Sequence, residues 1–211
     1  EEHLFDWGNS VLRLGMREAA IEVFTAAVAR HPKSARLHVG LGTAQYSKGG
    51  YAEAVKSFCA AVDLSPTDPR PYQFLGEMYG VAPELSDEIS PRLARFVKAQ
   101  PGNALAHLYY AMSLWKGSRS AANPADLKSV ETHLRRAVTI DPRLAKGFLE
   151  LGILLSEQQR YAEAIPELRQ AAKLGASNPQ PHYRLARAYQ STGQRALAAK
   201  ELEIFEQLKA A

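Results

Sequence analysis

A repeat of about 34 residues is the feature of this sequence that most restricts its fold. Gly8, Gly42 and Gly76 follow one another at intervals of 34 residues, and so do Phe24 and Phe58. Continued along the chain, this frame gives six blocks: residues 1–34, 35–68, 69–103, 104–144, 145–178 and 179–211. Repetition at such a period is typical of stacked units that each contact only their neighbours. We therefore expect a single domain, residues 1–211, built as a repeat array.

Every block carries two apolar stripes at helical spacing. With columns numbered by the first block, columns 4, 7, 8 and 11 form one stripe, and columns 20, 24, 27 and 28 form the other. Both follow the i, i+3, i+4 rule of amphipathic helices, and turn residues such as Gly49 and Gly193 separate them. Column 8 holds only Gly or Ala, which lets two helices approach closely, while column 24 holds only Phe or Leu. No segment alternates as a half-buried strand does, so we expect about twelve helices and no sheet.

The columns resemble those of the tetratricopeptide repeat family, whose unit of about 34 residues has the signature W-x2-L-G-x2-Y, A-x3-F and P. The second block matches through Leu41-Gly42, Ala54, Phe58, Ala61 and Pro66. Leu75-Gly76 in block three and Leu151-Gly152 in block five extend the match. The resemblance implies an all-α fold, a right-handed superhelix (α-solenoid) of about six helix–turn–helix repeats.

Two blocks depart from the pattern. Block three contains Pro91, which removes a backbone hydrogen bond inside a helix, so we expect a shortened helix from about Pro91 to Ala99. Block four has seven extra residues within 116–123, which predict a loop that could act as a mobile flap. Pro124 is then expected to restart the second helix of that block.

The resemblance also implies a binding groove. In the family, a second stripe on the first helix of each repeat, at columns 2, 5, 9, 12 and 13, faces the concave surface where partners bind. We refer to it as the groove stripe. Our candidates for groove or partner binding are Phe5, Asn9, Tyr46, Leu108, Met112, Trp115, Leu149, Ile153, Tyr183 and Arg187.

The groove stripe of blocks four and five is apolar. Its five large apolar residues predict an exposed patch suited to an apolar or amphipathic ligand: Leu108, Met112, Trp115, Leu149 and Ile153. The alternative is that tighter packing of the helices, or an inward-folded loop, buries these side chains.

Some family members hold a peptide's terminal carboxylate in a clamp that spans three repeats. The clamp uses Lys and Asn at columns 5 and 9, Asn at column 6 of the next repeat, and Lys and Arg at columns 2 and 6 of the third. Here those positions hold Phe5, Asn9, Gly40, Arg70 and Phe74, of which only Asn9 and Arg70 are compatible. The sequence therefore argues against this clamp.

No motif for catalysis, cofactor or metal binding occurs. The sequence lacks G-x-x-x-x-G-K-[ST], G-x-S-x-G and H-E-x-x-H. His38, His107 and His182 share column 4, but helices about 8–10 Å apart cannot bring them within about 2 Å of one zinc ion, so we interpret them as packing residues. The single cysteine, Cys59, is interpreted as an inert thiol. We expect no enzyme activity, no cofactor and no metal.

Charge and hydropathy exclude other classes of partner. The chain has 26 Lys and Arg against 22 Asp and Glu, a net charge of +4, and clusters such as Arg184 with Arg187 are interpreted as solvated faces. This charge and the apolar groove argue against nucleic-acid binding. No apolar run approaches the roughly 18 residues of a membrane span. Because the chain begins at Glu1 without Met or signal peptide, we expect a fragment of a longer protein, and its compartment stays open.

These observations predict a non-enzymatic protein–protein interaction module or scaffold that receives a peptide, helix or partner domain in its groove. The alternative is a substrate-recognition segment of a larger enzyme or of a secretion or assembly complex. Because Leu4, Phe5, Trp7 and Val11 make the first helix apolar on more than one face, we expect either an upstream repeat in the intact protein or self-association through the terminal repeats.

Overall fold

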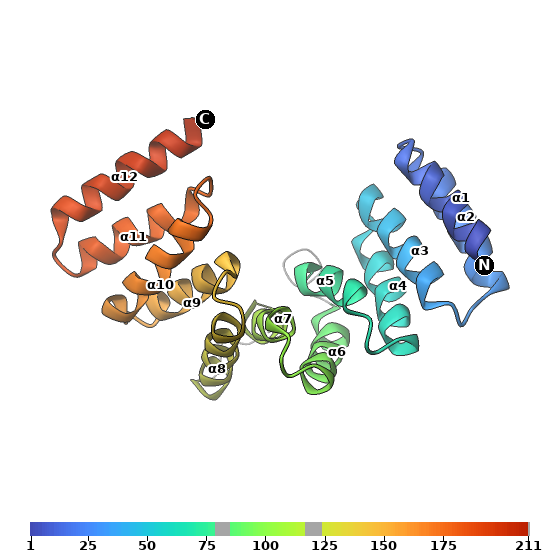
Figure 1. The fold of residues 1–211 in the computed structure, drawn as a ribbon, viewed down its shortest axis with the longest axis horizontal. Coiled ribbons are helices and arrows are strands. Elements are labelled where there is room, and N and C mark those ends of the chain that lie inside the picture. Colours follow the sequence, from blue (N-terminus) through green and yellow to red (C-terminus); the bar gives the residue numbers. More distant parts are fainter. Residues whose placement is uncertain (79–84, 117–123, 211) are drawn as a thin grey trace. The chain divides into compact units, whose positions relative to one another are not determined.

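The computed structural model describes residues 1–78, 85–116 and 124–210, and within these ranges it contains helices and no strand (Figure 1). The helices are α1 (Glu2–Arg13), α2 (Arg17–Arg30), α3 (Ala35–Lys48), α4 (Tyr51–Leu64), α5 (Pro69–Met78), α6 (Ser86–Ala99), α7 (Ala104–Lys116), α8 (Pro124–Ile140), α9 (Ala145–Glu157), α10 (Tyr161–Leu174), α11 (Gln180–Ser191) and α12 (Arg195–Ala210). Each of the six blocks holds one helix pair, so the expected twelve helices are confirmed.

The contacts group the chain into two compact units. The first comprises Glu1–Pro101 with Tyr109–Leu127, and the second comprises Gly102–Leu108 with Lys128–Ala211. Helices α1 to α5 pack in chain order in the first unit, and α9 to α12 do so in the second. A single domain over residues 1–211 stays a prediction.

Small residues beneath a large side chain join the two helices of a pair, as columns 8 and 24 predict. A Cβ atom on Gly8 would lie 2.6 Å from Cζ of Phe24, and one on Gly42 would lie 2.7 Å from Cε1 of Phe58. In the second unit, a Cβ on Gly152 would lie 2.6 Å from the Leu168 side chain. Because real Cβ atoms do not approach other atoms so closely, these helix pairs can pack in this way only with glycine at column 8.

In blocks one, two, five and six, the turn within the helix pair uses a left-handed residue at column 15. Gly15, Gly49 and Gly193 have φ angles of 78°, 89° and 78°, which glycine adopts without steric cost. In the fifth block, Gln159 takes this conformation with φ of 60° between α9 and α10.

The expectation for Pro91 is wrong, because α6 begins at Ser86 and contains this proline in its interior. A proline in the interior of a helix lowers the stability of that helix by about 3 kcal/mol. Ile89, Leu93 and Phe96 are nevertheless buried at i, i+4 and i+7, and each such burial contributes about 1.5–3 kcal/mol. Packing of this stripe therefore extends the helix to the N-terminal side of the proline.

The insertion in block four cannot be compared with its prediction as a flap, since residues 117–123 lie outside the described residues. The restart of the helix at Pro124 is confirmed by α8.

Candidate functional site

The predicted apolar patch is not a solvent-facing surface. Leu108 and Met112 are fully buried, and Leu149 and Ile153 are 5% and 3% exposed, so the expectation of an exposed patch is wrong for these four residues. Trp115 is half-buried. In α9, buried residues occupy every side of the helix from Gly147 to Leu155. A helix that is apolar all round is placed in the interior, which corresponds to the alternative of tighter packing.

The groove candidates Phe5 and Asn9 of the first unit are half-buried. The Phe5 ring meets the Phe24 ring edge-on, with centroids 6.0 Å apart, and the Arg36 guanidinium lies 4.0 Å above it. The Phe5 ring therefore has two partners within its own unit and acts mainly as a packing residue.

Tyr46, the third candidate in the first unit, is also half-buried between aromatic neighbours. Its ring centroid lies 5.5 Å from that of Tyr51 and 6.1 Å from that of Phe74. These edge-on contacts join α3 to the helices that follow it.

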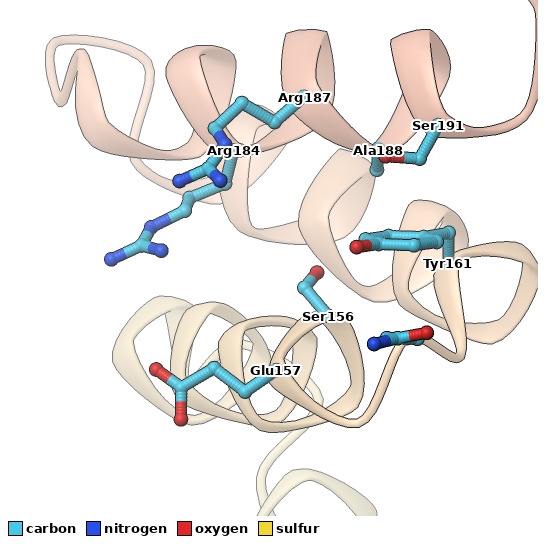
Figure 2. Close-up of a pocket in the computed structure, with 8 residues that line it drawn as sticks. Ser156, Glu157, Tyr161, Arg184, Arg187, Ala188 and Ser191 are labelled. Carbon is cyan, nitrogen blue, oxygen red and sulfur yellow. The ribbon is translucent and has the colours of Figure 1, made fainter.

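In the second unit, the groove stripe borders two pockets. The first, which we call pocket A, has a volume of about 260 Å³ and is lined by Ser156, Glu157, Gln159, Tyr161, Arg184, Arg187, Ala188 and Ser191 (Figure 2). The second, pocket B, has a volume of about 340 Å³ and is lined by Ala145, Lys146, Leu149, Glu150, Ala171, Gly175, Asn178, Gln180 and Pro181. The candidates Arg187 and Leu149 thus reach a pocket. Tyr183 is 38% exposed and lines neither, with its ring centroid 5.3 Å from that of Phe205.

Local structure explains how pocket A forms. Ser156 and Glu157 occupy the last turn of α9, and the left-handed Gln159 reverses the chain so that Tyr161 begins α10 opposite them. Arg184, with Arg187 and Ser191, lies on one face of α11 at i, i+3 and i+7. Pocket A is therefore bounded by the C-terminal end of α9 and by one face of α11.

Pocket A carries charges of both signs. Two guanidinium groups, those of Arg184 and Arg187, face one carboxylate, that of Glu157, and no ion pair joins any of the three to another described residue. Nε of Arg184 is covered from solvent and has no hydrogen-bond acceptor among the described residues. A guanidinium carries five donors, and most buried donors in proteins are paired.

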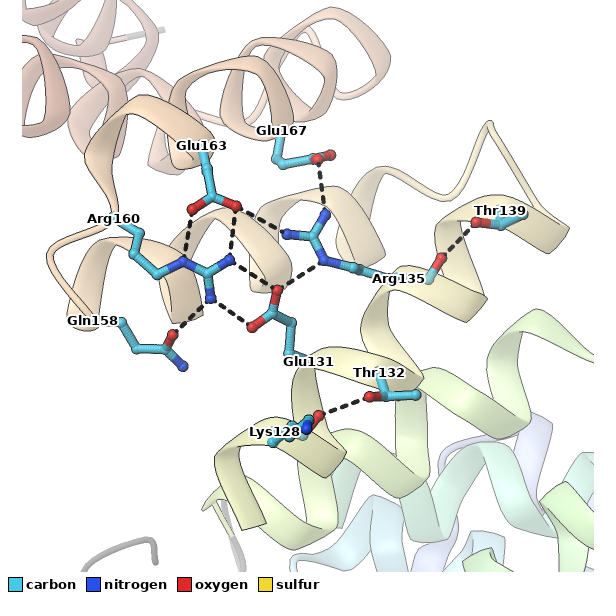
Figure 3. Close-up of polar contacts among 9 residues, drawn as sticks. All are labelled: Lys128, Glu131, Thr132, Arg135, Thr139, Gln158, Arg160, Glu163 and Glu167. Carbon is cyan, nitrogen blue, oxygen red and sulfur yellow. Dashed lines mark hydrogen bonds and ion pairs between the residues drawn. The ribbon is translucent and has the colours of Figure 1, made fainter. Parts of the chain in front are cut away.

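In a network of side chains beside the pocket, by contrast, the arginines are paired with carboxylates (Figure 3). Arg160 donates to Glu131 at 2.6 Å and to Glu163 at 2.7 Å, while Arg135 donates to Glu131 at 2.8 Å. The hydrogen bond from Arg160 is the main cause that lowers the pKa of Glu131, and it likewise lowers the pKa of Glu163. Because Arg160 lies between Gln159 and Tyr161, the network fixes the wall of pocket A.

The column-4 histidines all contact polar neighbours. Nε2 of His38 lies 3.0 Å from the Pro32 carbonyl, Nδ1 of His182 lies 2.7 Å from Glu201, and the two Nδ1 atoms of His107 and His133 lie 2.8 Å apart. Across residues 1–78, 85–116 and 124–210, no three His, Cys, Asp or Glu side chains gather as a metal site. Nor does any helix in that part of the chain combine the length and apolarity needed to cross a bilayer.

The described residues form twelve helices in six pairs, with small residues beneath large ones, and this arrangement defines a helical-repeat protein of the α-solenoid class. Family models described as tetratricopeptide repeat match residues 5–69 and 155–204. The chain belongs to the tetratricopeptide repeat family.

Known relatives agree with this assignment. The chain is 30% identical over 150 residues to tetratricopeptide repeat protein 37 of Xenopus laevis, a match that covers 65% of the chain and 9% of that protein. Among solved structures, Pseudomonas aeruginosa pilF is similar with a TM-score of 0.71 and 15% identity, over 99% of this chain and 96% of that one. YrrB, described as a TPR protein with an unusual peptide-binding site, has a TM-score of 0.61 and 17% identity, over 90% and 94%. The predicted all-α solenoid fold is confirmed.

Proposed function

We propose that this chain is a non-enzymatic protein-interaction module that binds an extended peptide segment of a partner along α9 and α11. The observation that carries the proposal is that two pockets border the same pair of helices. Groove-stripe residues Ser156, Glu157 and Arg187 line pocket A, and Lys146 and Leu149 line pocket B.

The size of the pockets favours single side chains as their occupants. Volumes of about 260 and 340 Å³ lie near the lower end of the range for small-molecule sites. An extended segment can place successive side chains in successive pockets, which a rigid domain surface cannot do as easily. The fold shared with YrrB, whose description names a peptide-binding site, supports a peptide as the ligand class.

The chemistry of pocket A supports binding rather than catalysis. Its lining contains neither histidine nor cysteine, and the Ser156 hydroxyl donates at 2.7 Å to the Gly152 carbonyl rather than to a base. A hydroxyl without an adjacent general base is a poor nucleophile.

The structure bears differently on two further expectations, the apolar character of the partner and self-association. The apolar character of the partner loses its support, because most of the proposed patch is buried and pocket A is polar. Self-association remains a proposal, supported by Trp7, Leu14 and Met16 of the first helix pair, whose side chains are 57%, 76% and 54% exposed. Sedimentation of the wild type and of Trp7→Glu tests it, with loss of a dimer expected in the variant.

The alternative of a recognition segment within a larger enzyme or assembly complex remains a second proposal. The Xenopus relative supports this alternative, because the segment that matches this chain makes up only 9% of that protein.

Selection of a random peptide library on the purified chain tests the main proposal. Ser191→Trp fills pocket A from an exposed position, and Lys200→Trp, at an exposed position of α12 outside both pockets and the groove stripe, is the matched control. We expect selected peptides to bind Ser191→Trp at least about tenfold more weakly than the control, which corresponds to about 1.4 kcal/mol. Equal binding by both variants, or no selected peptide at all, would contradict the proposal.

A further inference from the structure

We propose that pocket A recognises an acidic side chain, with the carboxylate of an Asp or Glu in the bound segment held between Arg184 and Arg187. This inference rests on the proposed peptide-binding function and specifies the ligand chemistry of one pocket. The group recognised is a side-chain carboxylate within the segment, so free peptide ends are not required.

The two arginines are placed to act together. They lie three residues apart on α11, which puts them on one face of the helix. Figure 2 shows both guanidinium groups extending to the same side of the pocket, with the Glu157 carboxylate opposite them on α9. Arg187 is exposed, and Arg184 is half-buried. A ligand approaching the pocket therefore meets two guanidinium groups at once.

The chain itself leaves these charges without partners. Neither Arg184 nor Arg187 forms an ion pair within the described residues, and the covered Nε of Arg184 lacks an acceptor there. In the same unit, Arg135 and Arg160 are each bonded to carboxylates. A ligand carboxylate at the terminal nitrogens of Arg184 would compensate a charge that the fold leaves unbalanced, and guanidinium groups match carboxylates in a two-bond geometry.

Glu157 favours a carboxylate over a phosphate. Its charge reduces the formal charge of the pocket lining from two positive charges to one. A single carboxylate balances that remainder, whereas a phosphate of nearly two negative charges exceeds it and would be repelled by Glu157 about twice as strongly. A phosphorylated side chain is the competing source of the same oxyanion chemistry.

Three end-blocked peptide libraries distinguish these ligands: nine-residue sequences with a fixed central Glu, Gln or phosphoserine and random flanks. We expect the purified chain to retain the Glu library at least about tenfold more than the Gln library at low salt, and to lose most of this preference at high salt. Arg187→Gln and Arg184→Gln should abolish the preference. Arg195→Gln, which removes an exposed charge on α12 outside the pocket, should keep it.

Folding of the variants is checked by helical circular dichroism. If Arg184→Gln loses helicity, the exposed Arg187→Gln alone carries the test. In addition, Glu157→Gln should raise retention of the Glu library severalfold, because it removes the opposing charge.

The outcomes separate failure of the inference from failure of the proposed function. Equal retention of the Glu and Gln libraries, with both reduced by Ser191→Trp, would overturn the acidic-ligand inference and leave peptide binding in place. Preference for phosphoserine over Glu would overturn the carboxylate assignment in favour of a phosphate. If no library binds above the level seen with Ser191→Trp, both the inference and the proposed function fail.

Discussion

A Cβ atom on Gly76 would overlap the ring of Tyr109, so that α5 and α7 approach as closely as a glycine allows. Elsewhere the glycine of column 8 faces the column-24 side chain of its own repeat, as Gly42 faces Phe58. At Gly76 the requirement for glycine is instead imposed by Tyr109 on α7, the first helix of the next repeat. Tyr109 is 4% exposed, and burial raises the pKa of its phenol to about 12.

Replacing Gly76 by leucine should therefore destabilise the first unit. The added side chain must displace a buried ring, and overpacking of this kind costs about 1–3 kcal/mol or more. Urea denaturation followed by circular dichroism measures the loss. Glu77→Leu, which adds the same side chain at an exposed position of α5, is the matched control, and an equal loss in both would contradict the packing argument.

Replacing Arg160 by glutamine should weaken the network beside pocket A. The Arg160 side chain is 35% exposed, so we expect a loss of only about 1 kcal/mol at low salt and less at high salt. Since the folded-state pKa of Glu131 is lowered below 4.5, the contribution is present above that pH and disappears as the pH falls below it. Urea midpoints of both proteins, measured at neutral pH and again in acid, should therefore converge in acid.

Protonation of His133 should destabilise the second unit. Burial, and then the neighbouring His107, lower its folded-state pKa below the ordinary 6.5. The unfolded chain therefore binds a proton first, and stability falls as the pH drops from about 6.5 toward the lower folded-state pKa. His133→Gln should lose this part of the pH dependence of the urea midpoint. Parallel pH profiles for the two proteins would show that His133 does not contribute.

Cys59 should react with a thiol reagent only after unfolding. The side chain is 3% exposed, and burial raises the pKa of its thiol to about 11, so that little thiolate exists near neutral pH. Absorbance of a chromogenic disulfide reagent, followed with and without urea, gives the two rates. A native rate equal to the unfolded rate would contradict the buried environment.

The sequence predicted those parts of the fold that depend on contacts repeated in every block. The pairing of Gly8 with Phe24 and of Gly152 with Leu168 follows from columns 8 and 24, and the structure has these contacts. The position of α6 could not be predicted in the same way, because burial of Ile89 outweighs the local preference of Pro91.

The candidate site was harder to predict, because a helical stripe gives the direction of a side chain but not whether another helix covers it. Leu149 and Ile153 were assigned to an exposed stripe although α9 is apolar on every side, a signal of full burial. Arg184 and Tyr161 lie outside the groove stripe, so the column pattern could not select them. The spacing of Arg184 and Arg187 was the available signal for pocket A, and it was interpreted as a solvated face.

The left-handed conformation of Gln159 lowers the stability of the fold, but it places a glutamine side chain in the lining of pocket A. A non-glycine residue in this conformation costs roughly 1–2 kcal/mol, and the equivalent turns at Gly15, Gly49 and Gly193 avoid that strain. Gln159→Gly should accordingly raise the urea midpoint while removing one lining amide from pocket A. An unchanged or lower midpoint would show that the Gln159 side chain contributes as much as its backbone costs. Thermostabilising engineering of this chain can therefore begin at Gln159, and the affinity of the variant for peptides selected on the wild type tests whether the strained residue contributes to the proposed recognition.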